Sequence, residues 1–255
     1  MEVTIHWFIE GVYKAAEKEA VIIVDATRFS STIIVALANG IEKIVPIDKP
    51  ENYVEYVNDR SETILAFEND EAQKVEYADI GNSPKELLDM ASLGKLSGKK
   101  VMIVRSRAGS QLLYAAKILG LKNVIVGSFP NARAVAEYIL SKGFKNVGIV
   151  CSGYRRTKFA LDDYLAAGCI VYELLKSRPD VMVDEELFGA YLAYVGVSNL
   201  GFPISELILK RTKVGRDLES IKCADDADII SQVNVYNIVP VLIKGCLVDA
   251  LKQRT

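Results

Sequence analysis

The sequence predicts an α/β fold in three layers, α/β/α, around a mainly parallel or mixed central sheet. The first observation is a recurring cassette of a short apolar strand, a polar turn and an amphipathic helix that ends at glycine, over residues 21–40, 101–120, 124–143 and 147–168. The second is that each strand is a nearly continuous run of Val, Ile or Met, which is typical of strands buried on both faces. The third is that no linker rich in Gly, Ser or Pro divides the chain, which predicts one compact domain over 1–255.

The elements between the first two cassettes follow from shorter patterns. Residues 41–47 predict a strand, residues 50–59 a helix, and residues 62–70 a second strand with an acidic end. The segment 77–90 predicts a turn into a helix, with Asn82 or Ser83 as the N-cap and Pro84 at the first helical position.

The last part of the chain has weaker patterns. Residues 171–195 predict helix with a break near Pro179, and residues 204–222 begin as a helix and then become polar. The apolar segment 238–251 predicts either a strand pair or a strand and a turn.

Composition excludes several classes of function. The net charge is -2 and the basic residues are dispersed, so nucleic-acid and membrane partners are not expected. The four cysteines form no C-x-x-C pair, which favours reduced thiols in the cytoplasm over metal clusters or disulfides. A single histidine, His6, leaves catalysis to other residue types, and we expect it to lie in a strand or at the surface without a chemical role. The N-terminal residues lack the pattern of a signal peptide.

Polar residues gather where the predicted strands end. Ligands of open parallel sheets bind beyond the carboxyl ends of the strands, where helix N-termini also offer free N–H groups. Arginines, hydroxyls and a few carboxylates at one edge suit a phosphate held together with a divalent cation. The residues that the turns contribute are Asp25, Arg28, Ser30, Ser31, Thr32, Glu68, Arg105, Ser106, Arg107, Ser128, Asn131 and Ser152.

Each of these residues also has a purely structural interpretation. Asp25 is as well placed to cap the following helix as to do chemistry, and Arg28 to form an ion pair with it. Asp162 and Asp163 fit a helix cap and a first-turn acid. The common phosphate-binding loops, G-x-x-x-x-G-K-[ST] and G-x-G-x-x-G, are absent, and the arginines after Cys151 have the wrong spacing for a cysteine phosphatase. The combination of polar turns at one edge is therefore more informative than any single residue.

Several ordered blocks resemble the 2-phosphosulfolactate phosphatase family. These are VIIVDATRFSSTIIVALANG, with its D-x-x-R and hydroxyl run, YADIGNSPKE, VGSFPNARAVA and VCSGYRRTKFALDDYLAAGCIV, followed by weaker echoes in VGRDL, ADDADII and IVPVLIKG. The match extends in order over most of the chain. It implies an α/β/α phosphatase that requires Mg²⁺ and converts (R)-2-phospho-3-sulfolactate to 3-sulfolactate and phosphate, on the route to coenzyme M.

The resemblance also implies site residues, and this sequence departs from the family pattern in places. The positions that match the polar pattern are Asp25, Arg28, Glu68, Asn82, Ser83, Gly109, Asn131 and Asp163. The family turn T-T-N-G-T is replaced by residues 106–110, SRAGS, which lose the asparagine and add Arg107. This change affects the expected substrate more than the expected fold.

These residues lead to a hypothesis of mechanism. We expect Asp25, together with Glu68 or Asp163, to hold Mg²⁺, and the nucleophile to be either a metal-activated water or Asp25 itself. We expect Arg28, with Arg105 or Arg107, and the amides of residues 30–32 to bind the phosphoryl oxygens. The residues expected to bind the substrate or its phosphate besides these arginines are Ser30, Ser31, Thr32, Asn82, Ser83, Gly109 and Asn131.

Two other functions remain open from the sequence. One is a phosphatase for another small phosphoester, and the other is a non-catalytic binder of anionic phospho or sulfo acids. For a second acid group on the substrate, Arg155 or Arg156 offers a further cation. We expect a homo-oligomer whose only ligand is a small anionic phosphorylated substrate.

Overall fold

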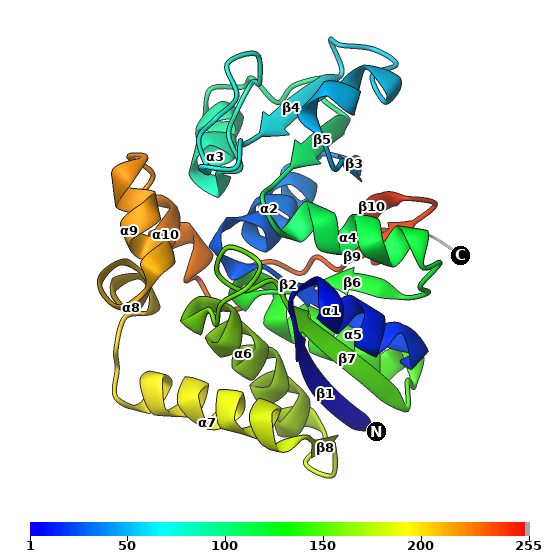
Figure 1. The fold of residues 1–255 in the computed structure, drawn as a ribbon, viewed down its shortest axis with the longest axis vertical. Coiled ribbons are helices and arrows are strands. Elements are labelled where there is room, and N and C mark those ends of the chain that lie inside the picture. Colours follow the sequence, from blue (N-terminus) through cyan, green and yellow to red (C-terminus); the bar gives the residue numbers. More distant parts are fainter. Residues whose placement is uncertain (253–255) are drawn as a thin grey trace.

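A computed structural model describes residues 1–252 and contains a ten-stranded mixed sheet (Figure 1). The order of the strands across the sheet is β4-β5-β3-β10-β9-β6-β2-β7-β1-β8. Their bounds are β1 Glu2–Trp7, β2 Ala20–Val24, β3 Lys43–Pro46, β4 Thr63–Phe67, β5 Val101–Arg105, β6 Val124–Val126, β7 Asn146–Cys151, β8 Met182–Val183, β9 Pro240–Ile243 and β10 Cys246–Asp249.

The helices connect these strands and cover both faces of the sheet. The α-helices are α1 Phe8–Lys14, α2 Ser31–Ala38, α3 Pro84–Ser92, α4 Gly109–Ile118, α5 Ala132–Lys142, α6 Leu161–Ser177, α7 Glu185–Asn199, α8 Ile204–Arg211, α9 Lys213–Ser220 and α10 Asp226–Ile230. Short helical turns are η1 Ala15–Glu17, η2 Ala26–Ser30, which is a π-helix, η3 Pro50–Glu55 and η4 Phe129–Asn131.

Strand β2 shows how the three layers are held together. Its residues alternate between the faces of the sheet: Ile22 and Val24 belong to the apolar cluster with helices α5, α6 and α7. Val21 and Ile23 belong to the cluster with helices α2 and α4. All five residues of the strand are buried, as expected for a strand covered on both faces. The predicted α/β/α architecture with a mixed sheet is confirmed.

The sheet has two parallel groups joined by the β9–β10 hairpin. Strands β4, β5 and β3 are parallel to one another, and so are β6, β2, β7, β1 and β8. Three successive pairings, β3–β10, β10–β9 and β9–β6, are antiparallel. The strands of one group therefore run in the opposite direction to the strands of the other group. Figure 1 shows the β3–β4–β5 group apart from the β6–β2–β7–β1 group, with α2 and α4 between them.

Twist explains why the carboxyl ends of both groups still meet. Neighbouring strands rotate by about 20 to 25°, so the five steps from β5 to β2 add up to roughly 100°. This rotation brings the end of β5 toward the end of β2, where the amide of Gly109 binds the Asp25 carboxylate. The loops of both groups therefore contribute to one site, although the two groups of strands run in opposite directions.

Some elements differ from the predictions made from sequence. The predicted helix over 50–59 is only the short 3-10 helix η3, because this segment buries no residue and Val54 is exposed. The segment 238–251 forms the strand pair β9–β10, and Ser83 is the N-cap whose side chain accepts a hydrogen bond from the Glu86 amide. Within residues 1–252 no single helix is long and apolar enough to cross a membrane. Helices α7 and α8 reach that length and apolar composition only when taken together, and the break between them is bent by 112°.

Candidate active site

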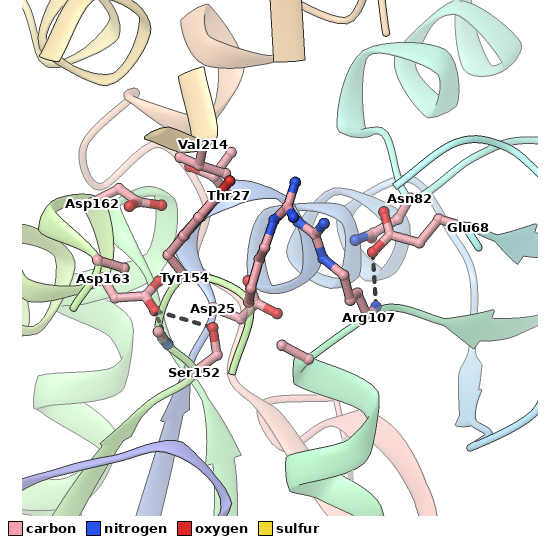
Figure 2. A pocket seen from close by; sticks show the side chains of 14 residues that line it. Asp25, Thr27, Glu68, Asn82, Arg107, Ser152, Tyr154, Asp162, Asp163 and Val214 are labelled. Atoms are coloured by element: carbon pink, nitrogen blue, oxygen red, sulfur yellow. Dashed lines mark hydrogen bonds between the residues drawn. The ribbon is translucent and has the colours of Figure 1, made fainter. Parts of the chain in front are cut away.

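A small polar cavity of about 40 Å³ lies where the loops after β2, β4, β5 and β7 converge, beside helix α9 (Figure 2). Charged side chains from all four loops point into it. Its lining consists of Asp25, Thr27, Glu68, Asn82, Arg107, Ala108, Ser152, Gly153, Tyr154, Arg155, Ala160, Asp162, Asp163 and Val214. Five of the residues to which the sequence assigns catalysis, phosphate binding or Mg²⁺ binding are in this lining: Asp25, Glu68, Asn82, Arg107 and Asp163.

Asp25 is fixed at the floor of the cavity by its neighbours. Its Oδ2 accepts a hydrogen bond of 2.8 Å from the amide of Gly109, and its own amide donates to Ser30 Oγ at 3.0 Å. Gly109 has no room for a side chain, since a Cβ there would lie 2.1 Å from Phe29 Cδ1 and 2.7 Å from Asp25 Oδ2. The close approach of this backbone therefore holds one carboxylate oxygen and leaves Oδ1 to the cavity.

Asp163 ties the loop after β2 to the loop after β7. Its Oδ1 accepts from the amide of Ala26 at 2.8 Å, and its Oδ2 accepts from Ser152 Oγ at 3.0 Å and from the amide of Gly153 at 2.8 Å. Both oxygens are thus engaged by the protein. Asp162, the preceding residue on helix α6, also lines the cavity, on the side opposite Glu68 in Figure 2.

The acidic groups around Asp25 disfavour one another's charge. Burial raises the pKa of Asp25 to about 7, and the nearby Glu68 and Asp162 carboxylates add to this increase. Burial also raises the pKa of Asp162, and it raises the pKa of Asp163 well above its usual range together with the charges of Asp162 and Asp25. A bound cation at this position would relieve that repulsion.

Glu68 organises the other side of the cavity. Its Oε1 accepts from the amide of Arg107 at 2.8 Å, and its Oε2 accepts from Arg28 Nη2 at 2.8 Å. Its backbone carbonyl accepts from Arg105 Nη1 at 2.6 Å, while Arg105 Nη2 binds Asp70. Arg105, the last residue of β5, therefore holds the loop after β4, and of the two arginines Arg105 and Arg107 only Arg107 lines the cavity.

Arg28 lies behind the cavity lining rather than in it. Its guanidinium is buried and is held by Glu68, by the Ala72 carbonyl at 2.9 Å and by Asp226 at 3.5 Å. Asp226 in turn accepts from Ser83 Oγ at 2.7 Å. The expected contacts of Arg28 and Ser83 with phosphate are therefore replaced by an ionic network that connects α10 to the loops after β2 and β4.

The hydroxyl groups of residues 30–32 and the side chain of Asn131 also form hydrogen bonds with the backbone. Ser31 Oγ donates to the Ala26 carbonyl and Thr32 Oγ1 to the Arg28 carbonyl, which secures the turn that carries Asp25. Asn131 is fully buried, and its Nδ2 donates to the carbonyls of Val126 and Ile238. The side chains of Ser30, Ser31, Thr32 and Asn131 are thus outside the cavity lining, contrary to the arrangement expected from their place after strands.

The oxygen atoms of the cavity suit a hard cation. Thr27 Oγ1 and Asn82 Oδ1 are buried without a hydrogen-bond partner, and Asp25 and Asp162 add two carboxylates. Mg²⁺ uses one or two carboxylates and completes its shell with waters and substrate oxygens. Among the described residues no three His, Cys, Asp or Glu side chains form a metal site on their own. The expected set of Asp25, Glu68 and Asp163 is therefore not preformed, because the last two have both oxygens engaged.

Several residues of the site have no clear signal in the sequence. Thr27 and Tyr154 are ordinary turn residues there, and Asp162 is as readily interpreted as a first-turn helix acid. Asp217 and Asp226 lie in the segments VGRDL and ADDADII, more than 50 residues from the last strand turn, and reach the site only through the packing of α9 and α10. The hint in the sequence is that both segments weakly echo the C-terminal blocks of the family.

Comparisons with known proteins identify the family of this chain. The family model described as 2-phosphosulpholactate phosphatase matches residues 9–245. A probable 2-phosphosulfolactate phosphatase of Caldanaerobacter subterraneus is 33% identical over 231 residues, which cover 90% of each chain. A protein of the same name from Carboxydothermus hydrogenoformans is 30% identical over 227 residues, which cover 89% of this chain and 87% of the relative. Another, from Thermotoga petrophila, is 28% identical over 232 residues, which cover 91% of this chain and 92% of the relative. The chain therefore belongs to the 2-phosphosulpholactate phosphatase family, a family of phosphoric monoester hydrolases.

Proposed function

We propose that this protein is a Mg²⁺-dependent phosphatase that hydrolyses (R)-2-phospho-3-sulfolactate to 3-sulfolactate and phosphate. The observation that carries the proposal is the cavity itself. It brings Asp25 and Asp162 together with Arg107 and Arg155, in a chain whose relatives are named for this activity. Acidic and basic groups in one polar cavity are what binding a phosphate together with a cation requires.

The charge of the cavity supports the need for a cation. Four carboxylates line it, those of Asp25, Glu68, Asp162 and Asp163. Only two guanidinium groups line it, those of Arg107 and Arg155. When these carboxyl groups are ionised, an anionic phosphoester meets net negative charge, which is unfavourable in a partly buried site unless a cation is bound. Asp162, Thr27 and Asn82 are the residues that would hold Mg²⁺ beside Asp25, and the bound ion would supply positive charge to the phosphoryl oxygens and orient them.

The protein's own groups would do the remaining work. Arg107 and Arg155 are the cationic side chains that line the cavity and would bind anionic groups of the substrate through charge-assisted hydrogen bonds. Asp25 Oδ1 faces the cavity, while Gly109 holds Oδ2, so that Oδ1 is the atom placed to accept a proton from an attacking water. Without a cation, burial and the neighbouring carboxylates raise the pKa of Asp25 to about 7, and a Mg²⁺ ion bound nearby would lower it and favour the ionised form that accepts a proton.

A substrate panel tests the proposal. Phosphate release is measured from (R)-2-phospho-3-sulfolactate and from p-nitrophenyl phosphate, each with Mg²⁺ and with EDTA. We expect fast release from phosphosulfolactate with Mg²⁺ and loss of release with EDTA. Release from the generic ester alone would instead show a phosphatase for another small phosphoester. No release under any condition would show a non-catalytic binder of anionic acids and would contradict the proposal.

The cytoplasmic location is part of the same proposal. It is supported by the four cysteines, all of which are free thiols, as is usual in a reducing compartment. The role in coenzyme M biosynthesis that the resemblance implies, and the expected homo-oligomer, stay predictions.

A further inference from the structure

Helix α9 places one acidic side chain, Asp217, between two loops of the cavity. Asp217 Oδ1 accepts a hydrogen bond from the Tyr154 hydroxyl at 3.4 Å. Its Oδ2 lies 3.6 Å from Arg107 Nη2 and 3.8 Å from Arg155 Nη2. The two arginines come from different loops, after β5 and after β7, and both line the cavity. Asp217 is therefore the common partner of two cations that are far apart in the sequence.

The contacts of Asp217 hold these cations without using up their hydrogen-bonding groups. Both distances to Oδ2 exceed that of a hydrogen bond, and Oδ2 is buried with no hydrogen-bond partner. Guanidinium groups have five N–H donors, so most donors of Arg107 and Arg155 remain for a ligand. The ion pairs offset the repulsion between the two positive charges, and Arg107 gives one further donor, Nη1, to the Asp70 carbonyl at 3.3 Å.

The rest of the loop after β7 limits where Arg155 can go. Its guanidinium carbon lies 5.4 Å from the centre of the Tyr154 ring, and Lys213 Nζ of α9 lies 5.9 Å from the same ring. The Arg155 side chain is nevertheless 60% exposed, so without an acidic partner it is free to turn into solvent. Long arginine side chains lose considerable rotamer entropy when they are fixed, and Asp217 fixes this one in advance.

We propose that Asp217 is a positioning residue that holds Arg107 and Arg155 in place to bind the second acid group of the substrate, its sulfonate or carboxylate. This inference rests on the proposed function, because it assumes a substrate with an acid group besides the phosphate. Two guanidinium groups that face one anion form charge-assisted hydrogen bonds, which are about twice as strong as neutral ones. Asp217 would then set the preference for acidic phosphoesters over neutral ones without touching the reacting phosphorus.

The test compares Asp217→Asn with a matched control on the same helix, Glu219→Gln. The control removes the same charge from an exposed position of α9 that has no ion pair among residues 1–252. We measure KM and kcat for (R)-2-phospho-3-sulfolactate and for p-nitrophenyl phosphate, which has no second acid group. We expect Asp217→Asn to lower the preference for phosphosulfolactate roughly tenfold, mainly through KM, and Glu219→Gln to leave it unchanged. Asp217→Glu should restore part of the preference.

A binding measurement separates this inference from the proposed function. Calorimetric titration with 3-sulfolactate, which has both acid groups but no phosphate, needs no turnover, and its affinity should fall with Asp217→Asn. An unchanged or tighter affinity, or an equal loss for both esters in variants with wild-type melting temperatures, would overturn the inference while leaving the phosphatase proposal intact. If the wild type releases phosphate from neither ester, the proposed function fails, and the titration alone then decides whether Asp217 positions the arginines.

Discussion

At the scale of single residues, the site depends on one position where a side chain is missing. Gly109 brings its amide to Asp25 Oδ2 at 2.8 Å, and the ring of Phe29 occupies the space that a Cβ would need. Asp25 is therefore oriented by backbone rather than by another side chain. This arrangement gives the carboxylate a fixed position and leaves one oxygen for chemistry.

Adding a methyl group at this position should damage both folding and activity. We expect Gly109→Ala to lower the free energy of unfolding by about 1–3 kcal/mol, since the added carbon forces Phe29 and Asp25 to move. The matched control is Gly196→Ala in helix α7, where a Cβ would meet no atom within 4 Å. It should raise the free energy of unfolding by about 0.5–1 kcal/mol through helix propensity. Urea unfolding of both variants, with phosphate release, checks this, and equal stability of the two would contradict it.

The only histidine offers a second test at this scale. His6 in β1 is about half buried, and burial, followed by the positive charge of Lys18, lowers its pKa below the ordinary value of 6.5. The folded protein therefore holds the neutral imidazole, while the unfolded chain takes up a proton below about pH 6.5. The contribution of His6 to stability should be complete above that pH and should fall as pH drops toward the lowered pKa.

A proton NMR titration measures this directly, because the sequence has a single histidine signal. The midpoint of the signal should lie below 6.5 in the folded protein. A midpoint at or above 6.5 would show that the strand does not disfavour the charged ring. The variant His6→Gln should lose less stability than the wild type between pH 7 and the midpoint.

The positions of single side chains could be predicted only in part. Asp25 and Glu68 follow buried strands, so their place at the cavity follows from the general rule for strand ends. Arg28 also follows a buried strand, yet its guanidinium lies behind the cavity, where it pairs with Glu68 and with Asp226, a residue almost 200 positions later in the chain. No local pattern reveals such a partner. The hydroxyls of Ser31 and Thr32 likewise turn to backbone carbonyls that only the folded turn presents.

At the scale of elements, two loops are joined through one buried carboxylate. Asp163 at the start of α6 accepts three hydrogen bonds, from the amides of Ala26 and Gly153 and from Ser152 Oγ. It thereby fixes the turn after β2 against the loop after β7. These are the turns that carry Asp25 and Arg155, so the geometry of the cavity depends on this connection.

Removing that carboxylate should be costly. In Asp163→Ala three hydrogen-bond donors lose their partner, which destabilises the fold, while removal of a buried charge offsets part of this loss. We expect the free energy of unfolding to fall by roughly 2–4 kcal/mol in total. Ser152→Ala, which removes only one of the three donors, should cost about 1 kcal/mol. Denaturant unfolding distinguishes the two. If Asp163→Ala were as stable as Ser152→Ala, the two loops would not be held together in this way.

The elements themselves were largely predictable, for a physical reason. Strands buried on both faces need long apolar runs, and the helices that cover them need an apolar face, so the cassettes at 21–40 and 101–120 are visible in the sequence. The segment 50–59 has aromatic and β-branched residues in a helical spacing, but it buries none of them completely. Without a buried face to stabilise it, the segment forms only the 3-10 helix η3.

At the scale of the whole molecule, the site exists because the sheet reverses direction and twists. The β9–β10 hairpin at the C-terminus separates the two parallel groups, and the accumulated rotation turns their carboxyl ends toward each other. The sequence predicts most of the strands, but neither their division into two groups nor their order, because a pairing such as β10 with β3 joins segments about 200 residues apart. Acidic groups from both parts of the molecule then crowd into one cavity.

This crowding predicts that Mg²⁺ stabilises the folded protein. At a Mg²⁺ concentration a hundred times the Kd, binding adds about 2.7 kcal/mol to the free energy of unfolding. For a chain of this size that is a rise in Tm of about 5–10 °C relative to EDTA. The rise should be much smaller in Asp162→Asn and unchanged in Asp180→Asn, a surface acid paired with Arg178. An equal rise in all three proteins would place the cation elsewhere.

The most direct test of the account is the turnover of Asp25→Asn. Phosphate release from (R)-2-phospho-3-sulfolactate is compared with that of the wild type at saturating Mg²⁺, with melting temperatures measured alongside. The account predicts a folded variant whose kcat is at least about a hundredfold lower, because the group that accepts the proton is lost. A folded Asp25→Asn that turns over like the wild type would contradict the central claim that the reaction takes place at this carboxylate.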